Sequence, residues 1–405
     1  MKKVLGFLRL CALGALVGLL GGLVAAGFAH LLSFVTTQRQ ATPWLVMLLP
    51  AGAVITVWLY RIFRMQDHAG ANEIILGIAN QKPIRTMAAP LIFVCGAITH
   101  LFGGSAGREG AALQLGGAGA AWLCRRLRLN GEDRSITVMS GMSAVFAGLF
   151  GTPLTAAVFI LEFRARPKVL GFAILPCLIS SVVAAKISGA LGVAAETVHL
   201  NSGAAFTFPT VAKMFLLALG IGVLGRLMCA VFHNAGHWSK RLVKNDYLRA
   251  GLAAAVVVVL TAMVGDMRYN GAGMSMAIAA VEGHAKWFDF LMKLIFTAIT
   301  LAAGLKGGEI VPTFCIGATF GCVFGGLLGI DGGLAAALGL VGLFCCATNS
   351  PISGILLGLE LFGLSAWPYY ALICLILWPL SAKNGLFQNR FFRSIDGLRE
   401  KQTVR

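Results

Sequence analysis

Long apolar runs separated by short polar or glycine-rich breaks occupy most of this 405-residue chain. They cover residues 4–35, 44–62, 86–124, 136–161, 169–185, 211–232, 248–264, 294–330 and 334–380. A membrane-spanning helix needs roughly 20 apolar residues, so the longer runs must each contain two or more helical segments. The pattern therefore predicts an all-α, polytopic membrane protein with broken and half-length helices, on the order of ten or more in total.

Two short glycine-rich segments that interrupt these runs resemble each other. G-G-S-A-G-R-E-G occupies residues 103–110, and A-G-L-K-G-G-E occupies residues 303–309. Each segment places one carboxylate, Glu109 or Glu309, near one basic residue in a stretch that is otherwise uncharged. Carboxylates inside membrane segments are costly, and they commonly mark ion or proton pathways. These two glutamates are therefore candidate transport residues.

The residues after the two segments repeat as well. Pro153 follows Glu109, and Pro351 follows Glu309, at nearly the same interval. A further carboxylate follows each proline at the same spacing, as Glu162 and Glu360. Duplicated hydrophobic halves with Gly/Pro-interrupted helices at equivalent places are typical of ion transporters whose site lies at the repeat interface.

This duplication sets the expected domain organisation. Only a short tail follows Pro379. We therefore expect a single transmembrane domain over residues 1–405, made of repeat halves at about 1–200 and 201–405, with no appended cytosolic regulatory domain.

Composition and charge placement agree with a membrane location. Hydrophobic residues make up 58% of the chain and charged residues 12%, whereas soluble domains average about 25% charged. A net charge of +17 could indicate a nucleic-acid partner, but the basic residues gather in short loops and tails beside apolar runs, which is typical of cytoplasmic segments. We expect both termini to be cytoplasmic and no nucleic-acid partner. The basic groups are Lys2, Lys3 and Arg9; Arg125, Arg126 and Arg128; Lys240, Arg241 and Lys244; and Arg390, Arg393, Arg399, Lys401 and Arg405.

The N-terminus resembles a secretory signal peptide because Lys2 and Lys3 precede an apolar run. That run continues beyond a typical signal core and contains Arg9. An uncleaved first membrane helix is therefore favoured over a signal peptide.

Signatures of enzymes and metal sites are absent from the sequence. The ten cysteines include no C-x-x-C pair, so they are expected to be reduced and to act as small hydrophobic residues. There is no H-E-x-x-H zinc motif, no phosphate-binding loop and no dinucleotide fingerprint. Ser105 or Ser143 could serve an intramembrane protease, but a serine among helical glycines is usually a packing residue. We predict no enzymatic activity, no metal and no cofactor.

A family resemblance rests on both repeated segments. A-G-R-E-G-A-A-L-Q-L-G-G at 106–117 resembles the Gly-(Arg/Lys)-Glu-Gly-Pro signature of the CLC chloride channels and proton-coupled antiporters, with Ala111 in place of the usual proline. G-G-E-I-V-P-T-F-C-I-G-A-T-F-G at 307–321 is similar to the fluoride-type branch, because ordinary members have an uncharged Gly-x-Phe-x-Pro where this chain has Glu309.

The resemblance spans the whole chain and implies an inverted-topology repeat fold. It also implies a homodimer in the bacterial inner membrane, with a separate anion pathway in each subunit. The implied activity is exchange of fluoride for protons, which exports fluoride and confers fluoride resistance. A chloride or broad-anion exchanger or channel of the same fold is the alternative.

The resemblance also implies roles for residues at matching positions. Glu109 is expected to be the gating and proton-coupling glutamate, and Glu309 a second proton-coupling or central-site glutamate. The anion-binding candidates lie in a loop, at two helix starts and near the C-terminus: Gly70, Ala71 and Asn72; Gly110 and Ala111 with Ile310 and Val311; and Phe387, which stands where chloride members have tyrosine.

Several positions depart from the family pattern. The loop H-A-G-A-N at 68–72 lacks the serine that holds chloride in the chloride branch. Phe163 occupies the position expected for an inner proton-transfer glutamate, so Glu162 is expected to make a structural polar contact instead. Val311 replaces a threonine that is common in fluoride-type relatives.

Helix N-termini supply free N–H groups and partial positive charge, so helices that open at Gly110 and Ile310 could bind an anion without a buried cation. A charged Glu109 could occupy the same position and leave it when protonated.

The structural alternative is a buried ion pair, either Glu109 with Arg108 or Glu309 with Lys306. Adjacent helical residues do not face each other, and Gly307-Gly308 disfavours a helix between Lys306 and Glu309.

Overall fold

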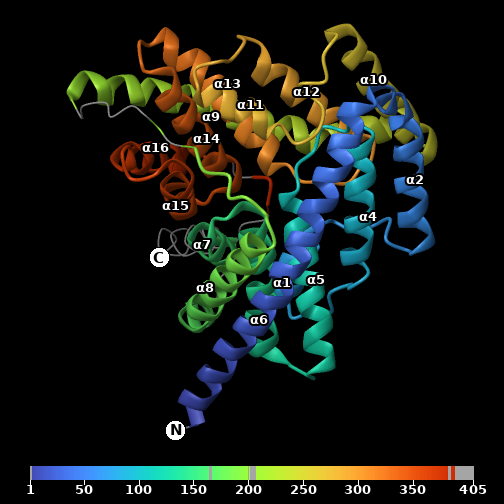
Figure 1. The fold of residues 1–405 in the computed structure, drawn as a ribbon, viewed down its shortest axis with the longest axis vertical. Coiled ribbons are helices and arrows are strands. Elements are labelled where there is room, and N and C mark those ends of the chain that lie inside the picture. The colour runs from blue at the N-terminus through green and yellow to red at the C-terminus, as the bar shows by residue number, and fades with distance from the viewer. Residues whose placement is uncertain (1, 164–166, 199, 201–206, 382–384, 388–405) are drawn as a thin grey trace, which may run out of the picture.

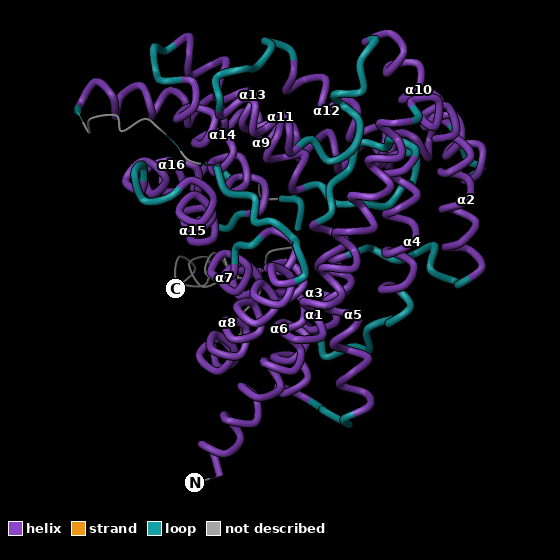
Figure 2. Tube along the Cα trace, viewed as in Figure 1, coloured by secondary structure: helices purple, strands orange, loops and turns teal. Residues whose placement is uncertain are grey.

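The computed structural model is built from α-helices (Figure 1) and describes residues 2–163, 167–198, 200, 207–381 and 385–387. These residues form sixteen α-helices and one short 3-10 helix, and they contain no strand (Figure 2). The predicted all-α architecture is confirmed.

The first half of the chain contains eight of these α-helices. They are α1 (Lys2–Ala41), α2 (Leu49–Ile62), α3 (Ala71–Ala79), α4 (Ala88–Leu101), α5 (Glu109–Arg126), α6 (Gly131–Phe150), α7 (Pro153–Phe163) and α8 (Pro167–Ala190), with the 3-10 helix η1 (Pro43–Leu48) between α1 and α2. In Figure 1, α1 runs obliquely upward from the N-terminus, and α5 to α8 lie around its lower half.

The second half contains the other eight α-helices in a similar order of long, short and half-length elements. They are α9 (Phe208–Leu242), α10 (Asp246–Val264), α11 (Met274–Val281), α12 (Asp289–Ala302), α13 (Ile310–Leu327), α14 (Gly332–Thr348), α15 (Pro351–Phe362) and α16 (Trp367–Leu380). Most of them occupy the upper part of the molecule in Figure 1.

Two long apolar runs are divided at glycine, as the sequence predicted. The run at 86–124 becomes α4 and α5, and the run at 294–330 becomes α12 and α13. After each first helix the chain turns at a glycine with positive φ, +83° at Gly103 and +80° at Gly304. L side chains rarely adopt this conformation, so glycine permits the sharp break that leaves α5 and α13 with free N-termini.

Close packing between helices depends on small residues, as is common in membrane proteins. A Cβ on Gly116 of α5 would overlap the Gly141 carbonyl of α6. In the second half, a Cβ on Gly317 of α13 would overlap the Gly339 carbonyl of α14. The helices that carry the two repeated segments are therefore held in place by backbone-to-backbone contact.

Six helical segments within the described residues are long and apolar enough to cross a membrane, judged by length and composition. They are Val4–Ala41, Pro43–Ile62, Gly171–Ala190, Phe208–Leu242, Asp246–Val264 and Ile310–Leu327. Shorter apolar helices, including α4, α7 and α14 to α16, accompany them. This combination agrees with the predicted mixture of full-length and half-length membrane helices.

Candidate functional site

The two glycine-rich segments, 103–110 and 303–309, lie against each other in the folded chain. Gly107 and Gly308 exchange two backbone hydrogen bonds, each 2.7 Å from nitrogen to oxygen. A Cβ on Gly110 would lie 2.9 Å from the Cα of Gly308, so only glycine allows this approach. Because α5 begins at Glu109 and α13 begins at Ile310, two helix N-termini with free N–H groups lie side by side.

Glu109 is fully buried at this junction. Its carboxylate faces the backbone N–H groups of Ile310 and Val311, but neither oxygen completes a hydrogen bond with any described protein group. A Cβ on Gly107 or Gly308 would overlap these oxygens, so both glycines make room for the side chain. The structure thus leaves a carboxylate without a fixed partner, packed against donors that could equally serve an anion.

Glu309 lies directly before α13, as its N-cap residue. Its side chain is only partly buried, and its carboxylate is close enough to Glu109 for the two to interact electrostatically. The backbone carbonyl of Glu309 accepts hydrogen bonds from the N–H and hydroxyl of Thr313, at 3.0 and 2.8 Å. These bonds fix the start of α13 and leave the carboxylate free to interact with Glu109.

Both ion-pair alternatives are wrong in this structure. Arg108 pairs with Glu196, not with Glu109. The Lys306 ammonium lies over the ring of Tyr60, 4.3 Å from its centroid, in a cation–π contact. No ion pair joins either glutamate to a basic side chain in the part of the chain that the structure describes.

The loop candidates and the C-terminal candidate lie close to each other. Gly70 has a φ of +63° and immediately precedes α3, which begins at Ala71. The side-chain nitrogen of Asn72 donates to the carbonyl of Leu386, at 3.4 Å. Phe387 packs against Phe163, with ring centroids 4.8 Å apart. The structure therefore brings the loop at 70–72 beside the segment at 385–387, although they lie far apart in the sequence.

Phe163 and Phe387 belong to a larger aromatic cluster. Phe159 contacts Phe163, Phe344 and Phe387, with centroid separations between 4.2 and 6.2 Å. Phe314 of α13 also contacts Phe344, at 5.6 Å. Phe163, at the position where the resemblance led us to expect a proton-transfer glutamate, is thus part of an apolar wall.

A polar connection between that loop and α5 was not anticipated from the sequence. His68 Nδ1 lies 2.7 Å from a Glu73 carboxylate oxygen, and its Nε2 lies 3.2 Å from the side-chain oxygen of Gln114. Gln114 in turn donates to the carbonyl of Gly110, at 3.0 Å. Arg85 donates to both Glu73 oxygens. The sequence signal was Gln114 itself, an uncharged polar residue within the small and apolar residues of α5.

A second unanticipated network supports the other side of the Glu109 segment. Lys293 is fully buried and donates to the carbonyls of Tyr269 and Gly271, at 3.0 and 2.7 Å. The side-chain nitrogen of Asn270 donates to the Gly103 carbonyl, at 2.7 Å. These bonds dock the loop before α11 onto the residues that lead to Glu109. Charged residues beside an apolar run, such as Lys293, were the available sequence signal.

Glu162 and Glu360 make reciprocal contacts between α7 and α15. The Glu162 carboxylate accepts hydrogen bonds from the backbone N–H groups of Ile352 and Ser353, both at 3.0 Å, and from the Ser353 hydroxyl. The Glu360 carboxylate accepts from the N–H groups at positions 154 and 155, both at 2.8 Å. Each glutamate thus caps the N-terminus of the other helix. The structural polar contact expected for Glu162 is confirmed.

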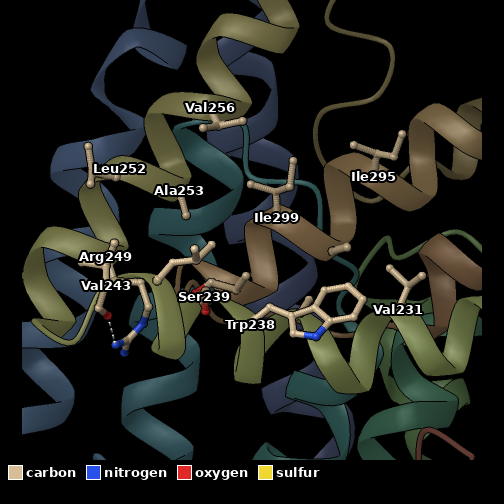
Figure 3. Close-up of a pocket in the computed structure, with 14 residues that line it drawn as sticks. Val231, Trp238, Ser239, Val243, Arg249, Leu252, Ala253, Val256, Ile295 and Ile299 are labelled. Carbon is tan, nitrogen blue, oxygen red and sulfur yellow. Dashed lines mark hydrogen bonds between the residues drawn. The ribbon is translucent and has the colours of Figure 1, made fainter.

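Figure 3 shows an apolar pocket. It has a volume of about 450 Å³ and is lined by side chains of α9, α10 and α12, including Trp238, Leu252 and Ile299. Arg249 at its edge donates to the Val243 carbonyl, at 3.2 Å. None of the candidate site residues lines this pocket. Among the described residues, no group of three or more His, Cys, Asp and Glu side chains is placed to hold a metal ion.

Known proteins resemble this chain along most of its length. The chain is 34% identical over 385 residues to a chloride/fluoride channel protein from Pseudomonas syringae pv. tomato, covering 93% of this chain and 85% of the relative. It is 27% identical over 409 residues to the H(+)/Cl(-) exchange transporter ClcA from Vibrio vulnificus, covering 91% of this chain and 85% of the relative.

Structural similarity is also high. The crystal structure of a CLC-type fluoride/proton antiporter superposes with a TM-score of 0.89 at 31% identity, covering 94% of this chain and 96% of that chain. The family described as voltage gated chloride channel matches residues 51–377. Together with the polytopic all-α fold, these matches show that the chain is a membrane protein of the voltage gated chloride channel (CLC) family.

Proposed function

We propose that this protein exchanges fluoride for protons across the membrane. The observation that carries the proposal is the pair of carboxylates, Glu109 and Glu309, at the junction of two helix N-termini, with no basic partner for either among the described residues. The N–H groups of α5 and α13 can coordinate an anion, and the carboxylates can carry protons. Both functions are thus present at one point of the fold.

Glu109 can couple the two movements by competition. When charged, its carboxylate occupies the space in front of the N–H groups of Ile310 and Val311. When protonated, it loses its attraction to these groups, and an anion can take its place. A proton taken up from one side of the membrane therefore admits an anion from the other side, and the proton is released when Glu109 returns. This competition moves the anion and the proton in opposite directions.

Glu309 provides the second carboxylate that such exchange requires. The inner proton route of the chloride branch is blocked in this chain, because Phe163 stands at that position within the aromatic cluster. Glu309 interacts with Glu109 and is only partly buried, so it can accept a proton from Glu109 and pass it onward. This role accounts for an acidic residue where ordinary family members have none.

The same arrangement favours fluoride over chloride. Fluoride is small and a strong hydrogen-bond acceptor, so it gains more than chloride from contact with a protonated glutamate and with backbone N–H groups. The solved relative at 31% identity is a fluoride/proton antiporter, which supports this assignment. The relative named chloride/fluoride channel protein keeps a broad-anion exchanger or channel as the second candidate.

The assembly and orientation are part of the proposal. We infer a homodimer in the bacterial inner membrane, with both termini cytoplasmic and one anion pathway per subunit. The single domain over 1–405 consists of inverted repeats at about 1–200 and 201–405. The paired bonds between Gly107 and Gly308 and the reciprocal caps of α7 and α15 support this internal relation. Export of fluoride by this dimer would confer fluoride resistance.

The decisive experiment uses purified protein in lipid vesicles. Fluoride or chloride efflux and proton uptake are recorded together under equal anion gradients. We expect fluoride efflux with stoichiometric proton movement in the opposite direction, and much slower chloride efflux. Chloride efflux as fast as fluoride efflux would exclude the fluoride-selective assignment, and fluoride efflux without proton movement would exclude exchange.

A further inference from the structure

A polar cavity of about 620 Å³ lies beside the Glu109 junction. Its walls come from the end of α1, the end of α4 and the loop before α11, and it reaches Val311 at the start of α13. Its lining includes the hydroxyl residues Ser33 and Thr36, the side chains of Arg39 and His100, and the acidic residues Glu196 and Asp266. The cavity therefore leads from polar surroundings to the N-terminus that faces Glu109.

Arg39 lines this cavity and has no carboxylate partner among the described residues. Its side chain is only 5% exposed, and it forms no ion pair with any described acidic residue. One terminal nitrogen donates to the His100 carbonyl, at 2.5 Å. Its Nε–H is buried and has no hydrogen-bond partner among the described groups. A buried guanidinium normally has an anionic partner, so the lack of a carboxylate partner for Arg39 among the described residues needs an explanation.

The other cations near the cavity already form ion pairs or hydrogen bonds. Arg108 pairs with Glu196, and Arg268 pairs with Asp289. The buried Lys293 donates to backbone carbonyls and lies within electrostatic range of both Arg39 and Glu109. Arg39 and Lys293 therefore place two positive charges near the approach to Glu109, and Asp266 in the cavity wall places one negative charge there. Neither cation receives a carboxylate partner from the described residues.

Two glycines pack closely against the Arg39 side chain. A Cβ on Gly271 would lie 3.1 Å from the second terminal nitrogen of Arg39, and a Cβ on Gly103 would lie 3.4 Å from its Cδ. Both glycines have positive φ, at +70° and +83°. A side chain at either glycine would therefore crowd Arg39, whose Nε–H has no partner among the described groups.

We propose that Arg39 forms an outer docking site for a small monovalent anion, which waits in this cavity before it replaces the Glu109 carboxylate. The anion is fluoride if the proposed function is correct, and in that respect this inference rests on that function. The polar cavity lets the anion keep part of its hydration shell, while the guanidinium supplies one charge-assisted donor. Such a site raises the local anion concentration at the entrance, as charged clefts do for other ligands.

A purely structural role for Arg39 is the competing explanation, because its bond to the His100 carbonyl also ties α1 to the end of α4. The two explanations differ in sidedness. An outer docking site affects anion capture from only one side of the membrane. A structural defect lowers the number of working transporters and affects both directions equally.

The test compares fluoride entry into right-side-out and everted membrane vesicles from cells that express the full chain. We expect Arg39→Gln to raise the half-saturating fluoride concentration roughly tenfold in one vesicle orientation, the factor expected when one charge-assisted hydrogen bond is lost. The maximal rate and the other orientation should be unchanged. Arg39→Lys, which keeps the charge, should recover much of the loss.

A second variant protects the test against misfolding of Arg39→Gln. Thr36 lines the cavity one helical turn before Arg39, so Thr36→Glu places a competing carboxylate beside an intact guanidinium. It should also raise the half-saturating concentration in the same orientation. Gln38→Glu adds the same charge to an exposed position that does not line the cavity, and it should behave like wild type. Unchanged half-saturation in both Arg39→Gln and Thr36→Glu, or equal rate losses in both orientations, would overturn the site.

Failure of the proposed function gives a different result. If wild-type protein moves no fluoride in exchange for protons, the function is wrong, and the docking site is judged by binding alone. Purified wild-type protein should then be stabilised against thermal unfolding by fluoride or chloride, and Arg39→Gln less so at the same anion concentration. Equal stabilisation of the two proteins, or none in wild type, would refute the site.

Discussion

Replacing Glu162 by glutamine tests whether this buried carboxylate is a structural cap or a proton carrier. Glu162 lies near the end of α7 and accepts two backbone N–H groups at the start of α15, together with the Ser353 hydroxyl. Glutamine has nearly the same shape but only one oxygen. Its NH₂ group would replace one of the two accepting oxygens and would therefore face a backbone N–H, which is also a donor.

The size of the effect follows from these contacts. One backbone N–H would lose its acceptor in a buried position, and an unsatisfied buried donor costs about 1–3 kcal/mol. The favourable interaction of a negative charge with the α15 N-terminus would also be lost, at about 0.3–1 kcal/mol and more where the site is buried. We therefore expect Glu162→Gln to lower the free energy of unfolding by about 2–4 kcal/mol.

The measurement is unfolding of purified protein in mixed micelles, followed by loss of helicity, alongside coupled transport in vesicles. Glu360→Gln is the matched variant, because Glu360 makes the corresponding two bonds to the start of α7. It should lose a similar free energy of unfolding. Glu132→Gln, at an exposed position in the first turn of α6, should lower stability by less than about 1 kcal/mol and leave transport unchanged.

Transport decides between the two roles. Folded Glu162→Gln protein should keep its ratio of protons to fluoride, because the cap touches neither Glu109 nor Glu309 in the described contacts. A variant with wild-type stability and abolished proton transport would refute the capping argument and assign Glu162 to the proton pathway.

Three further substitutions test the junction itself. Glu109→Gln cannot carry a proton or compete as an anion, so proton transport should be lost, with anion flux either abolished or uncoupled; normal fluoride-driven proton pumping would remove Glu109 from the mechanism. Glu309→Gln should give a stable protein that elutes like wild type but exchanges little fluoride for protons, and aggregation or low yield would instead indicate a structural role. Gly107→Ala should displace the Glu109 carboxylate and change the measured proton-to-fluoride ratio, whereas Gly119→Ala, which meets nothing within 4 Å, should leave that ratio unchanged. An unaltered ratio in Gly107→Ala would contradict the packing of that glycine against Glu109.

The sequence by itself determined the class of fold and the places where helices begin. Apolar runs of the required length must be helical in lipid, because helices satisfy all of their backbone hydrogen bonds internally. Glycine-rich breaks within these runs predicted helix starts at Gly110 and Ile310, and the structure begins α5 and α13 within one residue of both. The same local signals identified Glu109 and Glu309 as carboxylates in an apolar setting.

Nearness in the sequence did not predict which side chains form ion pairs. Arg108 and Lys306 are the nearest cations to the two glutamates in sequence, yet neither pairs with its neighbour. Successive residues point in different directions around a helix start, and the glycines at 307 and 308 interrupt any helical spacing. Short-range spacing therefore predicted the residue types of the site but not their partners.

Only the tertiary structure decided which distant segments meet. The Gly107 and Gly308 bonds, the link from His68 to Gln114 and the bond from Arg39 to the His100 carbonyl all join residues of different helices or loops. Helical periodicity fixes which side of a helix a residue occupies, but the opposing helix is set by how closely the backbones can approach. Those approaches depend on many glycine contacts at once, so the surroundings of Glu109 emerge only when the whole bundle is packed.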